Sequence, residues 1–313
     1  MASPVEQGPL DLTSLQMPNH KSKKDVPGHF PDPLVIPPSL KHQQTFIILH
    51  GRGSTAAKFA PPLLETLTTS GETIQTAFPH AKLIFLAASL NRAKIYKNSY
   101  THQWFDNWHM EEFGKRQDLA REGLNKSCKY VHGILRKEIA LIGEKNVVLW
   151  GLSQGCATSL TSLLTWDGTP FAATVGMCGY LPFSNFIKEI AEVKGSQDED
   201  DDDIFGNDNK PKDPATEAIT FLRDEIDLND KHGMLFQNIP VFMGHGNQDD
   251  KVPIEIGREA AKCLDLVGAN VKTIEYEGLG HWYSPQMLKD IFEFLRQNLS
   301  TQSGILGHSS LNI

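Results

Sequence analysis

The sequence predicts an α/β fold with a mostly parallel, doubly wound sheet and helices on both faces. Three observations support this prediction. Short apolar segments alternate along the chain with segments of helical spacing, which is typical of a sheet wound with helices. The apolar segments are almost continuously hydrophobic, as strands buried on both faces are. The 313 residues, 40% hydrophobic and 22% charged, are enough to enclose a large core.

The predicted strands are short apolar runs bounded by polar residues, glycine or proline. They comprise residues 45–49, 82–86, 146–150, 173–177, 240–243 and 271–276. The predicted helices carry apolar residues three or four positions apart, as in the series Leu124, Cys128, Val131, Leu135 and Ile139. They comprise residues 56–67, 119–142, 156–164, 254–267 and 285–299.

One domain is predicted to span residues 41–300, between a proline-rich N-terminal arm at 1–40 and a C-terminal tail at 301–313. An acidic insertion interrupts the domain at about residues 185–237. Its run of acidic residues at 198–203 lacks the spaced ligands and the turn glycine of a calcium-binding loop, so a solvated loop is the preferred interpretation. The insertion is predicted to be either a lid over the site or a surface loop.

Composition excludes several classes of partner and site. The formal net charge of −8 argues against a nucleic-acid ligand, and no run of about 18 apolar residues is present to insert stably in a membrane. The four cysteines form no C-x-x-C pair, so neither a metal site nor a disulfide framework is predicted. The N-terminus lacks the pattern of a signal peptide. We therefore expect a cytoplasmic protein with reduced, buried thiols and no metal.

The main candidate for chemistry is Ser153. Residues 151–155 have the sequence Gly-Leu-Ser-Gln-Gly and lie between a predicted strand and a predicted helix. A G-x-S-x-G turn in this position holds the serine in a strained conformation with its hydroxyl exposed above the sheet. The glycines remove side chains that would collide where strand and helix approach. The pattern predicts that Ser153 is a nucleophile.

A serine nucleophile needs a base and an acid that orients the base, and in this fold both follow the serine along the chain. Asp249 and Asp250 follow the strand at 240–243, and Asp249 is preferred, although either could cap the next helix. His281 follows the last predicted strand in a glycine-rich loop and is the predicted base. His50 and His245 also end strands, but each precedes a glycine in a turn and is interpreted as bracing a loop.

Acyl-transfer chemistry also needs backbone donors that stabilise an oxyanion. The N–H of Gln154, next to the nucleophile, is one predicted donor. The other is the N–H of Arg52, in the glycine-containing turn at residues 50–55 after the first predicted strand. The competing interpretation is that this turn merely caps the helix at 56–67.

These motifs resemble those of the phospholipase/carboxylesterase family, which includes the acyl-protein thioesterases. The resemblance covers about residues 45–299, interrupted by the insertion. It rests on His-Gly-Arg-Gly at 50–53, Trp-Phe-Asp at 104–106, the turn at 151–155, Gly-Tyr-Leu-Pro at 179–182, the segment from His-Gly at 245 to Val-Pro at 252, and Gly-His at 280.

The resemblance implies an α/β-hydrolase fold, a carboxylic ester or thioester substrate, either a small molecule or a lipidated protein, and no cofactor. It favours Asp249 over Asp250, because the family's acid is the third residue after His-Gly. It also implies that Trp104 lines the substrate pocket. Arg52 departs from the family, because an apolar residue is expected at that position, and this makes the pocket mouth more polar.

The predicted function is hydrolysis of an ester or thioester through an acyl-enzyme intermediate. Two alternatives stay open. The first is a small-ester hydrolase or an acyltransferase of a biosynthetic pathway, since the same acyl-enzyme can react with water or with another acceptor. The second is a non-catalytic protein of α/β-hydrolase fold that binds a ligand without turnover.

Overall fold

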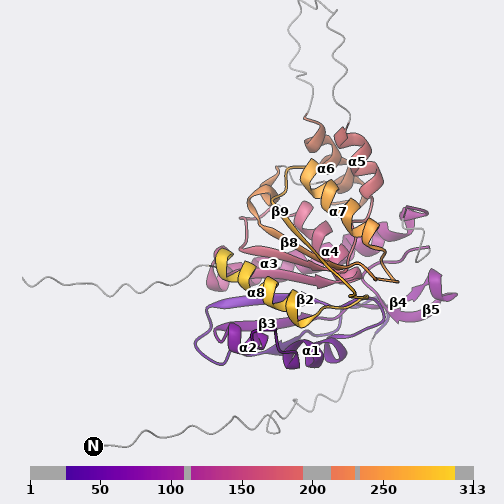
Figure 1. Ribbon diagram of the computed structural model, residues 1–313. Helices are drawn as coiled ribbons and strands as arrows, with labels where there is room; N and C mark the ends of the chain where they lie inside the picture. Colours follow the sequence, from indigo (N-terminus) through magenta and orange to yellow (C-terminus); the bar gives the residue numbers. More distant parts are fainter. Residues whose placement is uncertain (1–25, 109–113, 193–212, 230–232, 300–313) are drawn as a thin grey trace, which may run out of the picture.

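The computed structural model describes residues 26–108, 114–192, 213–229 and 233–299. Its centre is a seven-stranded sheet with the strand order β1-β3-β2-β6-β7-β8-β9 (Figure 1). Neighbouring strands run parallel, except β1, which is antiparallel to β3. Strands β4 and β5 form a separate antiparallel hairpin. The predicted α/β fold with a mostly parallel sheet is confirmed.

The strands of the large sheet are Leu34–Ile36 (β1), Gln44–Leu49 (β2), Ala81–Leu86 (β3), Val147–Leu152 (β6), Ala173–Met177 (β7), Val241–Gly246 (β8) and Val271–Tyr276 (β9), and those of the hairpin are Leu90–Ala93 (β4) and Ser99–His102 (β5). Strands β6 and β8 continue past the predicted ends into glycine-containing segments. Pairing explains the extension, because Leu152 aligns with Met177 and Gly246 with Tyr276. Pairing between neighbours outweighs the low strand propensity of glycine.

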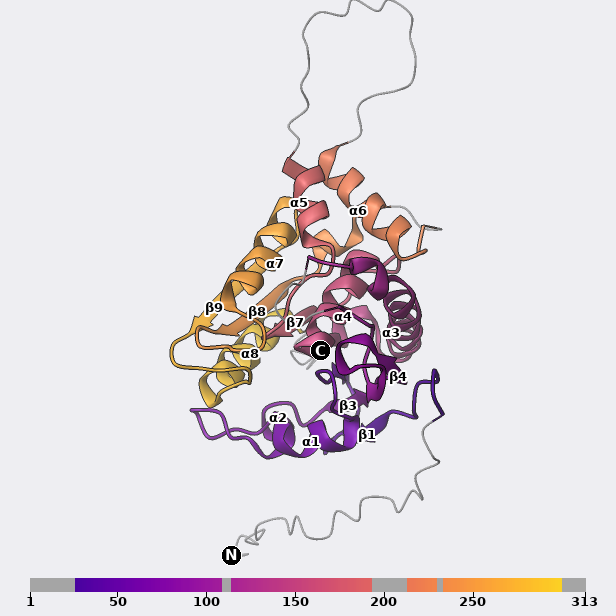
Figure 2. The ribbon, with the colours of Figure 1, turned by 90° about the vertical axis from the view of Figure 1, so that its right-hand side faces the viewer.

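The helices are Ala56–Glu65 (α1), Ile74–Ala77 (α2), Arg121–Ile142 (α3), Gln154–Leu164 (α4), Ser184–Glu192 (α5), Pro214–Glu225 (α6), Ile254–Leu266 (α7) and Pro285–Asn298 (α8). They cover both faces of the sheet (Figures 1 and 2). Along β2, Ile47 and Leu49 pack into the core shared with α3, α4 and α7. Phe46 and Ile48 pack into the core shared with α1 and α8. This alternation follows from the two-residue period of a strand.

The sheet begins earlier in the chain than the sequence predicted. Strand β1 lies inside the proline-rich segment 1–40 that was predicted as an arm outside the domain, and Val35 aligns with Ile84 of β3. Phe30 also stacks on Tyr130, with ring centroids 4.3 Å apart. Prolines cannot donate to a ladder but are tolerated beside an edge strand, so their number did not exclude pairing. Residues 1–25 of the predicted arm lie outside the described residues.

The described parts of the insertion are mostly helical. Helix α5 packs against α6 and α7, and Ile187, Ala218 and Leu222 are fully buried in the core on the α3–α4 face. An ion pair between Lys262 and Glu192 joins α7 to α5. Helices α5 and α6 thus pack onto the α7 side of the domain, at the end of the molecule opposite α1 and α2 (Figure 2). The acidic run at 198–203 lies outside the described residues.

Among the described residues, no helix combines the length and the apolar character needed to cross a membrane. All four cysteines are buried and none is paired with another.

Candidate active site

Ser153 lies between the end of β6 and the start of α4, in a backbone conformation that L-residues rarely adopt. Its φ is 57° and its ψ is −122°. The Ser153 N–H donates to Met177 O of β7 at 2.8 Å, which fixes the turn to the sheet. The first N–H groups of a helix have no acceptor within the helix, so the start of α4 presents donors beside the hydroxyl.

Two glycines make this turn possible. A Cβ on Gly151 would lie 2.3 Å from Gly155 O, and a Cβ on Gly155 would lie 2.5 Å from Leu49 O of β2. Both distances are too short for any side chain, so the G-x-S-x-G spacing is a steric requirement for packing α4 against β2 and β6. Cys156 is equally confined, because a Cβ on Gly179 would lie 2.3 Å from its sulfur. Burial raises the pKa of the Cys156 thiol well above its usual value.

The strained backbone predicts an unusual stability series at this position. Ser153→Gly should be more stable than Ser153→Ala by about 1 kcal/mol, because glycine relieves strain of roughly 1–3 kcal/mol and loses some of this gain as extra unfolded-state entropy. Urea unfolding of both variants measures the difference. At Ser99, an exposed strand residue without positive φ, the same pair of substitutions should give the opposite order. A Ser153 pair that behaves like the Ser99 pair would contradict the strain.

The structure brings His281 and Asp249 together with Ser153. His281 Nε2 lies 2.9 Å from Ser153 Oγ, although the two residues are 128 positions apart. His281 Nδ1 lies 2.7 Å from Asp249 Oδ2 and 2.9 Å from Oδ1. The carboxylate can only accept, so in the neutral ring the hydrogen is on Nδ1, which donates it to Asp249. Nε2 is then free to accept the Ser153 hydroxyl proton. The loops that carry Asp249 and His281 can meet in this way because they pack closely: a Cβ on Gly246 would lie 2.1 Å from Leu279 O.

Asp249 is held by three groups besides His281. Its Oδ1 accepts the N–H groups of Lys251 at 2.9 Å and Val252 at 2.8 Å, and His245 Nε2 lies 3.2 Å from Oδ2. Burial by itself raises the pKa of this carboxyl, but the hydrogen bonds from His245, His281 and Val252 outweigh it and lower the pKa below its usual value. The Asp249 carboxylate is therefore ionised at neutral pH.

Asp250, the alternative acid, points away from this group. Its side chain is 72% exposed and pairs with Lys251 at 2.9 Å. That ion pair lowers the pKa of Asp250, with no contribution from either histidine. Of the two neighbouring aspartates, the structure places only Asp249 on His281.

The contact between His245 and Asp249 was missed by the sequence interpretation. His245 Nε2 donates to Val252 O at 2.8 Å while facing the carboxylate. Helix α7 closes over the other side of the ring, since a Cβ on Gly257 would lie 2.3 Å from Nδ1. The available signal was its spacing, four residues before Asp249 at the end of a strand.

The turn after β2 passes directly beside the Ser153 hydroxyl. A Cβ on Gly51 would lie 3.2 Å from Ser153 Cβ and 3.7 Å from Oγ. Ser54 N donates to Gly51 O at 3.2 Å and closes the turn that contains Arg52. Burial raises the pKa of Tyr180 to about 12, and the positive charge of Arg52 acts on it in the opposite sense. The turn is therefore close enough to Ser153 for a backbone N–H of the turn to reach an oxyanion formed there.

Trp104 lies behind this turn, and none of its described hydrogen bonds goes to the Ser153 hydroxyl. Its indole Nε1 donates to His50 O at 2.8 Å, and its backbone N–H donates to Gln154 Oε1 at 3.0 Å. Gln154 Nε2 donates in turn to Phe105 O at 2.7 Å. Trp104 thereby connects the turn at 50–55 to the first residue of α4.

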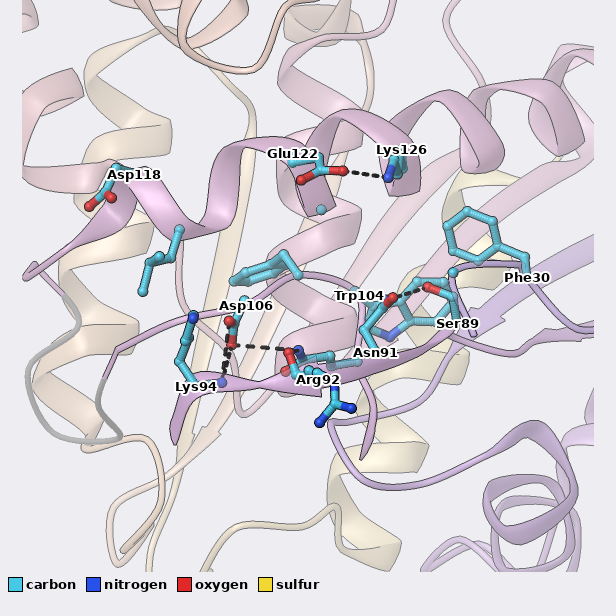
Figure 3. A pocket seen from close by; sticks show the side chains of 15 residues that line it. Phe30, Ser89, Asn91, Arg92, Lys94, Trp104, Asp106, Asp118, Glu122 and Lys126 are labelled. Atoms are coloured by element: carbon cyan, nitrogen blue, oxygen red, sulfur yellow. Dashed lines mark hydrogen bonds and ion pairs between the residues drawn. The ribbon is translucent and has the colours of Figure 1, made fainter. Parts of the chain in front are cut away.

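The far side of Trp104 lines a pocket of about 390 Å³ between the β4–β5 hairpin and the start of α3 (Figure 3). Phe30, Ser89 and Asn91 lie on this side of the indole, and Asp106 accepts the Lys94 N–H at 3.0 Å. Ser153, Asp249 and His281 are not among the lining residues. The contact of Trp104 with the Ser153 surroundings is therefore made through His50 and Gln154.

Within the described ranges, no group of three or more His, Cys, Asp or Glu side chains is arranged to hold a metal ion. The geometry at Ser153 is a hydroxyl, an imidazole and a carboxylate in hydrogen-bonded series, beside a tight backbone turn. This arrangement can activate a serine hydroxyl for attack on an acyl group without a metal.

Comparisons with known proteins show what the chain is similar to. Residues 31–195 and 220–299 match the model of the phospholipase/carboxylesterase family. Acyl-protein thioesterase 1 of Gibberella zeae is 27% identical over 274 residues, covering 85% of this chain and 95% of the relative. A probable SOBER1-like carboxylesterase of Arabidopsis thaliana is 27% identical over 263 residues, covering 83% and 81%.

Among solved structures, acyl-protein thioesterase 2 of Zea mays superposes with a TM-score of 0.61 at 22% identity, covering 86% of this chain and 99% of that one. Arabidopsis thaliana SOBER1 superposes with a TM-score of 0.60 at 21% identity, covering 82% and 99%. At these identities the superpositions establish a shared α/β-hydrolase fold.

Proposed function

Because the chain belongs to the phospholipase/carboxylesterase family, we propose that it is a serine hydrolase that cleaves carboxylic esters or thioesters through an acyl-enzyme intermediate. The observation that carries the proposal is the series from Ser153 Oγ to His281 Nε2, at 2.9 Å, and from His281 Nδ1 to Asp249 Oδ2, at 2.7 Å. Ser153 is the nucleophile, His281 the general base and acid, and Asp249 the group that orients the imidazole.

In the first half-reaction, Ser153 Oγ attacks the acyl carbonyl carbon while His281 Nε2 takes the hydroxyl proton. The lowered pKa of Asp249 keeps its carboxylate ionised, and this negative charge stabilises the imidazolium that forms. The carbonyl oxygen becomes an oxyanion, which accepts hydrogen bonds from the backbone N–H groups of Arg52 and Gln154. The carbon–sulfur or carbon–oxygen bond then breaks, and the leaving thiol or alcohol takes its proton from His281 Nε2.

In the second half-reaction, water attacks the acyl-Ser153 carbonyl as His281 Nε2 removes a proton from it. The carboxylic acid is released when the bond to Ser153 Oγ breaks, and Oγ recovers its proton from His281. Every proton transfer in these two half-reactions passes through His281 Nε2. A cytoplasmic location, with four free and buried thiols, completes the proposal.

Two features bear on the substrate class. The acyl-protein thioesterase relatives favour a thioester carried by a lipidated protein, and the carboxylesterase relative favours a small ester. Arg52 puts a cationic side chain on the turn beside Ser153, in contrast to the apolar residue expected there. We propose thioesters and oxyesters together as the substrate class, with Trp104 lining the substrate pocket and joined to the site through His50 and Gln154.

A panel of thioesters and oxyesters with graded acyl chains tests the proposal. Hydrolysis should exceed background for at least one chain length, and a fluorophosphonate probe should label the protein at Ser153. An initial burst of leaving group equal to the enzyme concentration would identify the acyl-enzyme. Background rates across the panel together with an unlabelled Ser153 would contradict the proposal and favour a binding protein that does not turn over its ligand.

A further inference from the structure

His50 lies at the end of β2, fully buried beside the turn that borders Ser153. Its two ring nitrogens have different partners. Ala88 N donates to Nε2 at 3.1 Å, and Nδ1 lies 2.7 Å from Gly51 O. An N–H donor faces Nε2, so Nε2 carries no hydrogen. A carbonyl only accepts, so the ring hydrogen is on Nδ1 and is donated to Gly51 O.

The Gly51 carbonyl and the Arg52 N–H belong to one peptide unit. In a planar trans peptide, the C=O and the N–H point in opposite directions. A donor that holds the Gly51 carbonyl therefore also fixes the direction of the Arg52 N–H. The hydrogen bond from His50 is shorter than the 3.2 Å bond that Ser54 N makes to the same carbonyl.

We propose that His50 is a positioning residue that aims the Arg52 N–H at the oxyanion by holding the Gly51 carbonyl from the opposite side. The inference rests on the proposed function, since it concerns the same acyl-transfer site. His50 touches neither substrate nor reacting atoms. It acts through the peptide unit that lies beside Ser153.

The backbone of His50 is held as well as its ring. The indole of Trp104 donates to His50 O at 2.8 Å, and the backbone N–H of Trp104 donates to the Gln154 side chain. The residues that provide the two proposed oxyanion donors, Arg52 and Gln154, are thus linked through Trp104 and His50. Preorganised donors of this kind cost no rearrangement when charge develops in the transition state.

The ring is suited to this role because it stays neutral. Burial lowers the pKa of His50 to about 4, the bond to Gly51 O raises it in part, and the nearby His102 lowers it further. A protonated ring could no longer accept the Ala88 N–H. At neutral pH the Nδ1–H tautomer therefore persists, with its hydrogen directed at Gly51.

A matched pair of variants separates positioning from simple bracing. His50→Asn places an amide nitrogen where Nδ1 lies, which keeps a donor to Gly51 O and loses the acceptor for Ala88. His50→Gln reaches the position of Nε2, which keeps the acceptor and loses the donor. Positioning predicts that His50→Gln lowers kcat by roughly 10- to 100-fold with little change in KM, because a misaligned oxyanion donor loses part of its effect. His50→Asn should retain more of kcat.

A boronic acid, which forms a tetrahedral adduct with Ser153, provides the second measurement. Its affinity should fall in His50→Gln by the same factor as kcat, while the affinity of the product carboxylate stays near that of the wild type. Equal losses of kcat in both variants, or a kcat of His50→Gln close to wild type, would overturn the proposal.

The tautomer can be measured in the wild type even if His50→Gln does not fold. Imidazole ¹⁵N shifts should show a protonated Nδ1 and an unprotonated Nε2 for His50 at neutral pH, and the opposite tautomer would sink the inference. This measurement does not depend on turnover. An inactive wild type would refute the proposed function, whereas an active wild type with an indifferent His50→Gln variant would refute only the role of His50.

Discussion

Replacing Ser153 by alanine is expected to lower kcat by on the order of 10⁶-fold, the size of effect seen when a serine nucleophile is removed. In the proposed mechanism the hydroxyl forms the acyl-enzyme bond, and no neighbouring thiol is suited to replace it. Of the nearby thiols, Cys156 is fully buried and burial raises its pKa. Steady-state kinetics on the best ester of the panel measures the loss.

The control for Ser153→Ala is an intact fold with an unlabelled site. The variant should unfold cooperatively at nearly the same urea concentration as the wild type, because alanine keeps the same backbone strain. Fluorophosphonate labelling should disappear. Residual turnover within tenfold of the wild type, in a preparation that is free of wild-type protein, would remove Ser153 as the nucleophile.

Asp249→Asn should lower kcat by about 10⁴-fold through the histidine tautomer. The N–H groups of Lys251 and Val252 both face Oδ1, so the amide of asparagine must keep its oxygen there. The NH₂ group then faces His281 Nδ1, which has to accept. The ring hydrogen moves to Nε2, and His281 can no longer take the Ser153 proton.

The matched control is Asp250→Asn, the adjacent residue. Its exposed carboxylate pairs only with Lys251 among the described ion pairs, so activity should stay close to the wild type. Comparable losses in both variants would indicate a general effect of charge in this loop. A loss confined to Asp250→Asn would mean that the assignment of the acid is wrong.

The sheet was predictable because hydrophobic runs record burial directly. Residues such as Ile47, Leu149 and Val175 are fully buried in strands that sequence reasoning located. Strand β1, in the proline-rich start of the domain, was not predictable. It has only three residues, and its partner β3 lies more than 40 positions away in the chain. A pattern too short to show a period carries no register.

The candidate site could be located from chain order, but its supporting contacts could not. Ser153, Asp249 and His281 each follow a strand whose end is recognisable in the sequence. The contact of His245 with Asp249 depends on how closely α7 approaches the His245 ring, which Gly257 permits because it has no side chain. The hydrogen bond from His50 to the Gly51 carbonyl depends on which ring nitrogen faces the Ala88 N–H. Sequence spacing puts His245 near Asp249 at the end of a strand, but it does not encode the orientation of either imidazole ring.

The distance along the chain between Ser153 and His281 has a consequence for how activity arises during folding. The two side chains are 128 residues apart, and β7, β8 and β9 lie between them in the chain and extend the sheet from β6 in that order. During synthesis on the ribosome, the proposed nucleophile would emerge long before the proposed base. Catalytic competence should therefore return in the slowest phase of renaturation, after most secondary structure has formed.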